Sequence, residues 1–155
     1  MKYIVWLLLA ATTLFCNACY TEPNPLSSVA TVGGPIALVR TFTVTNPATN
    51  TQVSALTAAT ATPLTLTVAY TTLDVPVTQV NLYRQIGTMR TQVSTVSVNV
   101  APSMNQVRQT FTYTIPAGTA ANTRIFLIAG VVTANGESFS GNGVSGAGTV
   151  ILTSR

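Results

Sequence analysis

Residues 64–71 have the sequence Leu-Thr-Leu-Thr-Val-Ala-Tyr-Thr, and this stretch decides the fold that we expect. Apolar residues occupy every second position, and threonines fill most of the positions between them. Successive side chains of a β-strand point to opposite faces, so this spacing predicts one face in a core and one in water. β-Branched threonine suits an exposed pleated face. The stretch therefore predicts a half-buried strand of an all-β protein.

Related patterns on both sides predict further strands. They lie at 36–45, 77–86, 93–100, 107–115, 124–134 and 149–153, with a short strand near 52–56 inside the ambiguous segment 51–62. The nearly continuous apolar run at 124–134 is also compatible with a buried helix, but its β-branched residues favour a central strand. Turn residues separate the strands at 46–50, 74–76 and 135–136, where Asn-Gly predicts a type I′ turn.

The predicted core consists of facing apolar rows. They comprise Leu64, Leu66 and Val68; Val96, Val98 and Val100; and Phe111, Ile125 and Leu127. The period-two pattern at 36–45 also predicts one shared face for Leu38, Phe42 and Val44. About seven strands, with turns roughly every 8–12 residues, are typical of a β-sandwich. No amphipathic helix is evident between these strands.

The order of these segments resembles bacterial immunoglobulin-like or fibronectin-type-III-like modules. The motifs that carry the likeness are LTLTVAY at 64–70, V-x-x-V-x-L-Y-R at 77–84, FTYTIPAG at 111–118, and a long strand that ends at A-N-G, 134–136. The resemblance covers roughly 63–153 and implies a single antiparallel immunoglobulin-like β-sandwich, which we place at 36–155. It implies no particular activity, because this fold carries many.

The N-terminal residues predict export. Lys2 precedes an apolar run at 3–15, and small or polar residues follow it. This order is typical of a helical signal peptide, here 1–18. The apolar run is shorter than the roughly 18–20 residues that a membrane-spanning helix needs.

Ala18 and Cys19 resemble the processing site of bacterial lipoproteins, although Cys16 stands where that family usually has leucine. The resemblance implies cleavage before Cys19, lipidation of its thiol with palmitate-type chains, and anchoring in the bacterial cell envelope at the outer membrane. The alternative is an ordinary secretory signal that leaves Cys19 as a free thiol. Residues 19–35 hold three prolines and a Gly-Gly pair and predict a flexible tether after Cys19.

The composition argues against catalysis and against cofactors. The chain has no histidine, and its two cysteines lie at the signal boundary, so a Ser-His-Asp triad and a thiolate metal site are both unavailable. Asp74 and Glu137 are the only acidic residues beyond the tether, so they are the only possible carboxylate pair for glycosidase-type hydrolysis. Both adjoin turns, where acidic side chains usually face water. The G-x-G-x-x-G match at 141–146 precedes a strand, whereas a dinucleotide site needs a helix there. We therefore predict no enzyme, metal or cofactor.

Few residues suggest a ligand. Arginines are scattered, which argues against nucleic acid. Arg84 and Arg90 flank one loop and are either a small anion-binding patch or simply solvated. Tyr70 and Tyr113 share the spacing of core residues, so packing is the expected role of these aromatics.

Two functions remain open. The first is an exported, membrane-anchored, non-catalytic lipoprotein with a role in adhesion or envelope assembly. The alternative is an accessory glycan- or peptide-binding surface lipoprotein. Lysine commonly protects sheet edges, and the mature chain has none, so the expected partners are other envelope proteins or further copies that pair with sheet edges. The terminal strand around Ile151 is the edge that we predict.

Overall fold

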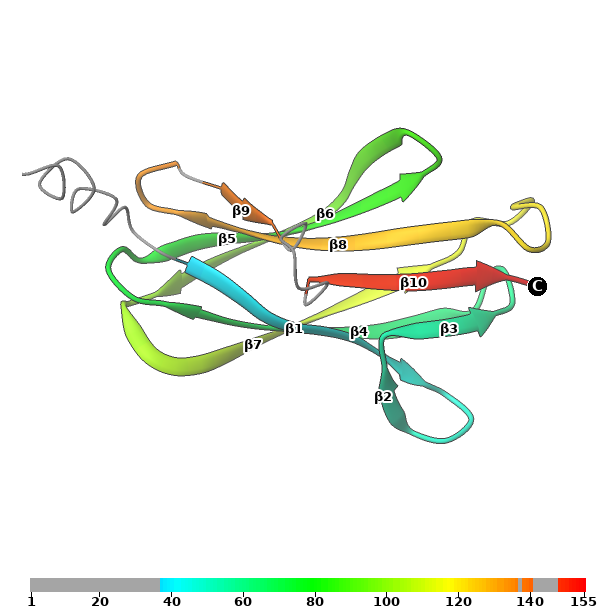
Figure 1. Cartoon of the computed structure of the whole chain (residues 1–155), viewed down its shortest axis with the longest axis horizontal. Helices are drawn as coiled ribbons and strands as arrows, with labels where there is room; N and C mark the ends of the chain where they lie inside the picture. The colour runs from blue at the N-terminus through cyan, green and yellow to red at the C-terminus, as the bar shows by residue number, and fades with distance from the viewer. Residues whose placement is uncertain (1–36, 137, 141–147) are drawn as a thin grey trace, which may run out of the picture. The chain divides into compact units, whose positions relative to one another are not determined.

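The described residues form an all-β structure of two sheets. The computed structural model describes residues 37–136, 138–140 and 148–155, which contain ten strands (Figure 1). The first sheet has the order β2 (Thr51–Val53), β1 (Ala37–Asn46), β4 (Pro63–Thr72) and β7 (Ser103–Thr114). The second has the order β3 (Ala55–Ala58), β10 (Thr149–Ser154), β8 (Arg124–Thr133), β5 (Val77–Ile86) and β6 (Met89–Val100), and β9 (Ser138–Ser140) also pairs with β8.

The predicted immunoglobulin-like sandwich is confirmed. Each of the seven longer segments expected from the alternation is a strand, and the additional strands β2, β3 and β9 have only three or four residues. The predicted signal peptide, Cys19, the tether and the glycine-rich segment 141–147 lie outside the described residues.

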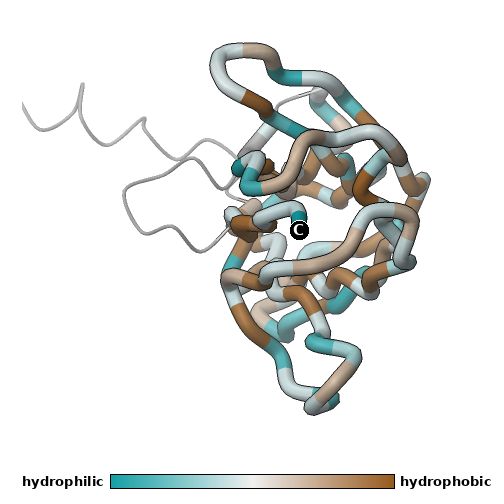
Figure 2. The backbone as a smooth tube through the Cα atoms, turned by 90° about the vertical axis from the view of Figure 1, so that its right-hand side faces the viewer, coloured by the Kyte–Doolittle hydropathy of each residue, from teal (hydrophilic) through white to brown (hydrophobic). Residues whose placement is uncertain are grey.

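The hydrophobic core lies between the two sheets and is built from alternate residues of each long strand. Leu66 of β4 lies between Val44 of β1 and Phe111 of β7, and all three are buried. Ile125 and Leu127 of β8 face them from the second sheet. Figure 2 shows hydrophobic and hydrophilic positions alternating along the tube. The predicted valines Val96, Val98 and Val100 pack against this core but are only partly buried, because β6 is at the end of its sheet.

Contrary to the prediction from the period-two pattern, Leu38 does not share a face with Phe42 and Val44. Leu38 is 38% exposed, whereas Ala37, Phe42 and Val44 are buried. The register between β1 and β4 shifts between Val39 and Thr41, which marks a β-bulge at Arg40. An extra residue reverses the alternation. Leu38 therefore lies on the opposite face from Phe42.

The ambiguous segment 51–62 contains two short strands in different sheets. β2 pairs with β1, and β3 pairs with β10 in parallel, with only Ser54 between the two strands. The expectation of a purely antiparallel sandwich is wrong at this pair. The segment is too short for either strand to show a readable alternation.

The turn at Asn135–Gly136 is not of type I′. That turn needs positive φ at both central residues, but of the two only Gly136 has a positive φ, 81°. The Gly136 amide donates to the Thr133 carbonyl at 2.9 Å. This geometry fits a type I turn over Ala134 and Asn135, followed by a glycine in the left-handed region.

The terminal strand β10 is not an edge, so our prediction for Ile151 is wrong. β10 lies between β3 and β8, and the Ile151 amide donates to the Ser54 carbonyl at 2.9 Å. The long strands that end the two sheets are β6 and β7. They follow each other in the chain and are joined by Ala101 and Pro102.

Candidate functional site

Of the residues considered for catalysis, the structure describes only Asp74. Asp74 is exposed in the turn between β4 and β5, while Glu137 and the segment 141–146 lie outside the described residues. Within the described part of the chain, no three His, Cys, Asp or Glu residues are grouped as a metal ion would require. The same residues contain no helix that is both long and apolar enough to cross a membrane.

Arg84 and Arg90 do not form a common anion-binding patch, because they lie on opposite faces of the β5–β6 hairpin. Arg84 pairs with Thr91, and Gln85 pairs with Arg90, so the two arginines differ by one position in the alternation. The Arg90 guanidinium carbon is 4.2 Å from the centre of the Tyr83 ring on the outer face. This cation–π contact covers one face of Tyr83, where a sugar ring would otherwise stack.

A chain of hydrogen bonds holds Tyr83 in place on that outer face. Gln92 Nε2 donates to Thr95 Oγ1 at 2.6 Å, and Thr95 Oγ1 donates to Asn81 Oδ1 at 2.9 Å. Asn81 Nδ2 in turn donates to the Tyr83 hydroxyl oxygen at 3.3 Å. These contacts link β5 to β6 and are a structural network rather than a free binding surface.

Arg84 points into the molecule. It is opposite Leu127 of β8, a core residue, so its side chain starts from the inner face of the second sheet. It lines a pocket of about 240 Å³ together with Ile86, Met89 and Thr91. The inward direction could have been predicted, because Arg84 continues the alternation of Val80 and Leu82. We had interpreted Arg84 only as a residue that flanks a loop.

Two buried tyrosines carry hydroxyl groups that form no hydrogen bond of ordinary geometry with the described residues. Tyr70 is 0% exposed and Tyr113 is 7% exposed, which confirms that both rings pack in the core. Burial raises the pKa of both hydroxyls. At Tyr113 the nearby Arg84 guanidinium opposes this rise in pKa but does not cancel it. Both groups therefore stay protonated at neutral pH.

The edge strands β6 and β7 differ in regularity. In β6 the register with β5 shifts between Leu82 and Tyr83, which leaves Val93 as a bulged residue. In β7 the register with β4 is unbroken from Val107 to Thr114. Bulges protect edges because they disturb the row of free backbone groups. β7 is thus the more accessible of the two edges.

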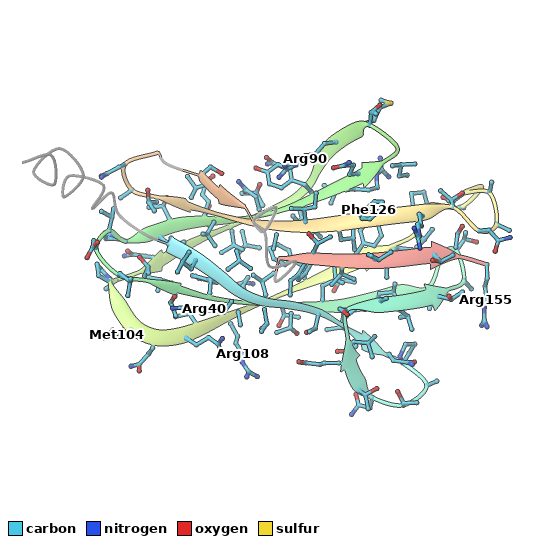
Figure 3. The ribbon with its side chains drawn as sticks, in the orientation of Figure 1. Arg40, Arg90, Met104, Arg108, Phe126 and Arg155 are labelled. Atoms are coloured by element: carbon cyan, nitrogen blue, oxygen red, sulfur yellow. The ribbon has the colours of Figure 1, made fainter. Side chains whose placement is uncertain are left out.

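The side chains of β7 do not protect its edge either. Its inner face carries Val107, Gln109, Phe111 and Tyr113, none of which is charged. Arg108 is its one charged residue, and it points outward, away from the sandwich (Figure 3). Among the described residues no strand pairs with the free side of β7.

The outer face of the first sheet is polar, as predicted. Thr43, Thr67 and Thr110 lie side by side on β1, β4 and β7, and Thr65 lies beside Thr112. Threonine in these rows presents methyl and hydroxyl groups to the surroundings. These threonines occupy the exposed positions of the alternating pattern that predicted the strands.

Comparisons with known proteins support the fold alone. No family model matches the chain, and no curated protein matches it. A Niemann-Pick type C2 protein from Japanese carpenter ant aligns with a TM-score of 0.51 and 7% identity, over 80% of this chain and 96% of that one. A superoxide reductase (neelaredoxin) from Ignicoccus hospitalis aligns with a TM-score of 0.44 and 11% identity, over 86% of this chain and 89% of that one. The two sheets and the alignment with the Niemann-Pick type C2 protein define the class as a two-sheet β-sandwich.

Proposed function

We propose that the chain is an exported, lipid-anchored, non-catalytic envelope protein that acts in adhesion or assembly through its β7 edge. The observation that carries this proposal is the unbroken, undefended β7 edge, Val107–Thr114, at the end of the first sheet. Free N–H and C=O groups along such an edge accept an extended segment of another chain as an additional strand.

Support for the membrane anchor comes from the sequence. The signal-like residues 1–18 end at Ala18, and the proline-containing tether begins with Cys19. A lipoprotein anchor with three acyl chains exceeds the two hydrophobic signals that stable membrane attachment needs. The anchor keeps the sandwich at a membrane surface, where edge pairing joins it to neighbouring proteins.

The anchor is tested by replacing Cys19. Intact mass spectrometry of membrane-extracted protein is expected to show an acylated chain that begins at Cys19. Cys19→Ser is expected to move the protein into the soluble fraction. Cys16→Ser is the control: because residue 16 is removed with the signal peptide, this variant is expected to stay in the membrane. An unmodified wild-type chain in the soluble fraction would contradict the lipid anchor.

The edge is tested with Gln109→Lys. Gln109 is half-buried on the inner face of β7, so lysine there places a charge that an added strand would have to cover. We expect this variant to lose self-association or partner recovery from intact envelopes, measured by cross-linking and pull-down. The matched control is Thr67→Lys, which adds the same charge to the outer face of the internal strand β4.

Circular dichroism checks that both variants remain folded. If folded Gln109→Lys protein associates as the wild type does, β7 is not the binding edge. If the purified domain turns over a substrate, the non-catalytic part of the proposal fails.

A further inference from the structure

A charged side chain lies on the inner face of the β5–β6 hairpin without an acid to neutralise it. Arg84 is only partly exposed and lines the pocket of about 240 Å³ with Ile86, Met89 and Thr91. No ion pair to Arg84 occurs among the described residues. Asp74, the one acidic residue in the described part of the chain, is exposed beside the opposite end of β5. A partly buried cation of this kind lacks the compensation that buried charges normally have.

The other charges nearby have the same sign. Arg90 lies on the outer face of the same hairpin. Arg124 begins the neighbouring strand β8, at the end of the sheet to which the hairpin belongs. Neither residue supplies a negative charge that could pair with Arg84.

Tyr113 of β7 supplies the second observation. Its hydroxyl is buried and lies close enough to the Arg84 guanidinium, across the space between the sheets, for hydrogen bonding and charge both to lower its pKa, although no hydrogen bond of ordinary geometry joins them among the described residues. A guanidinium donates and cannot accept, so the hydroxyl oxygen is the acceptor that orients Arg84.

We propose that the pocket formed by Arg84, Ile86, Met89 and Thr91 binds a carboxylate that carries a short aliphatic group. The planar guanidinium donates two parallel hydrogen bonds to the carboxylate oxygens, the geometry that distinguishes arginine from a simple point charge. The Tyr113 hydroxyl lies beside Arg84 rather than in the lining of the pocket, and it holds the guanidinium in this orientation. Ile86 and Met89 cover the aliphatic group, since both are apolar and line the same pocket.

The site favours a carboxylate over a phosphate for a reason of charge. Arg84 is the one charged residue that lines the pocket, and its guanidinium balances a single negative charge, whereas a phosphate near neutral pH carries more charge and a larger hydration shell. The apolar walls add affinity only for an anion with a hydrocarbon part. This site is on the second sheet and is separate from the edge function proposed for β7.

The experiment titrates the purified full chain with butyrate and follows binding by amide chemical shifts in NMR spectra. Butyramide, inorganic phosphate and acetate are the comparison ligands. Butyrate is expected to shift the resonances of the β5–β6 hairpin and of Tyr113. Butyramide is expected not to bind, and acetate and phosphate are expected to bind more weakly than butyrate.

Variants locate the effect. Arg84→Gln is expected to weaken butyrate binding by about ten- to a hundredfold, as the loss of hydrogen bonds to a charged group predicts. Tyr113→Phe, which keeps the ring and removes the hydroxyl, is expected to weaken it by about three- to tenfold. Arg90→Gln is the matched control, because it removes the same charge from the opposite face of the hairpin. It should leave butyrate binding in the pocket nearly unchanged.

Several results would overturn the proposal. They are no butyrate binding by the wild type at tens of millimolar, equal binding of butyramide, tighter binding of phosphate, or equal losses in Arg84→Gln and Arg90→Gln. If Arg84→Gln does not fold, the Tyr113→Phe and butyramide results decide alone.

Discussion

Leu66→Ala is expected to lower the free energy of unfolding by about 2–5 kcal/mol, the range for truncating a fully buried leucine. Leu66 is 0% exposed and lies on β4, which has a strand on either side in the first sheet. Its neighbours Val44 and Phe111 are buried beside it, so they cannot move far to fill the space that the truncation leaves. Urea denaturation followed by circular dichroism measures the change.

The adjacent residue is the control. Thr67 lies on the same strand but faces outward between Thr43 and Thr110. Thr67→Ala removes no core volume, so its cost should be about 0.5 kcal/mol or less, as for most surface substitutions. Equal costs at positions 66 and 67 would mean that the strand faces are exchanged, because a one-residue shift moves every side chain to the other face.

Ile151→Pro is expected to prevent stable folding rather than to block an edge. Proline lacks the amide that donates from Ile151 to the Ser54 carbonyl, and Ile151 also lies opposite Phe126 of β8. Removing one ladder bond in a sheet interior leaves a buried acceptor unpaired, at a cost of about 1–3 kcal/mol, and the proline ring adds strain to both neighbouring strands.

The matched control for this position is Ile151→Thr. Threonine keeps the β-branch and the backbone amide, and the side chain of Ile151 is on the half-exposed outer face of its sheet. The threonine variant should therefore unfold at nearly the wild-type temperature in a thermal melt, while the proline variant shows little or no cooperative transition. A proline variant that melts like the wild type would contradict the interior position of β10.

Strand positions could be predicted from the sequence because their signal is local. In β4 and β8 the alternation or the apolar run itself identifies the strand, and both lie where we expected. The neighbours of each strand could not be predicted, because pairing depends on residues far apart. Ala55 pairs with Ile151 across 96 positions, and nothing within either segment indicates the other. The bulge at Arg40 was equally hidden, since it changes the face of Leu38 without changing the composition.

The candidate pocket could be predicted only in part from the sequence. Arg84 follows Val80 and Leu82 at the spacing of core residues, so an inward arginine could have been inferred from period two alone. Tyr113 was predicted to face the core. That these side chains approach each other depends on how the two sheets are superposed, which is a property of the whole fold.

The interior position of β10 affects the order in which the protein can form during synthesis. The second sheet places β10, the last of the described strands in chain order, between β3 and β8, so β3 has no partner in its sheet until residues 149–154 have left the ribosome. A chain under synthesis can form the β5–β6 hairpin early but cannot complete that sheet. If the protein is exported as proposed, a segment that crosses the membrane before synthesis ends does so without its finished second layer. Completion of the sandwich then waits for residues 149–154, and slow closure is expected of a topology with such distant pairings.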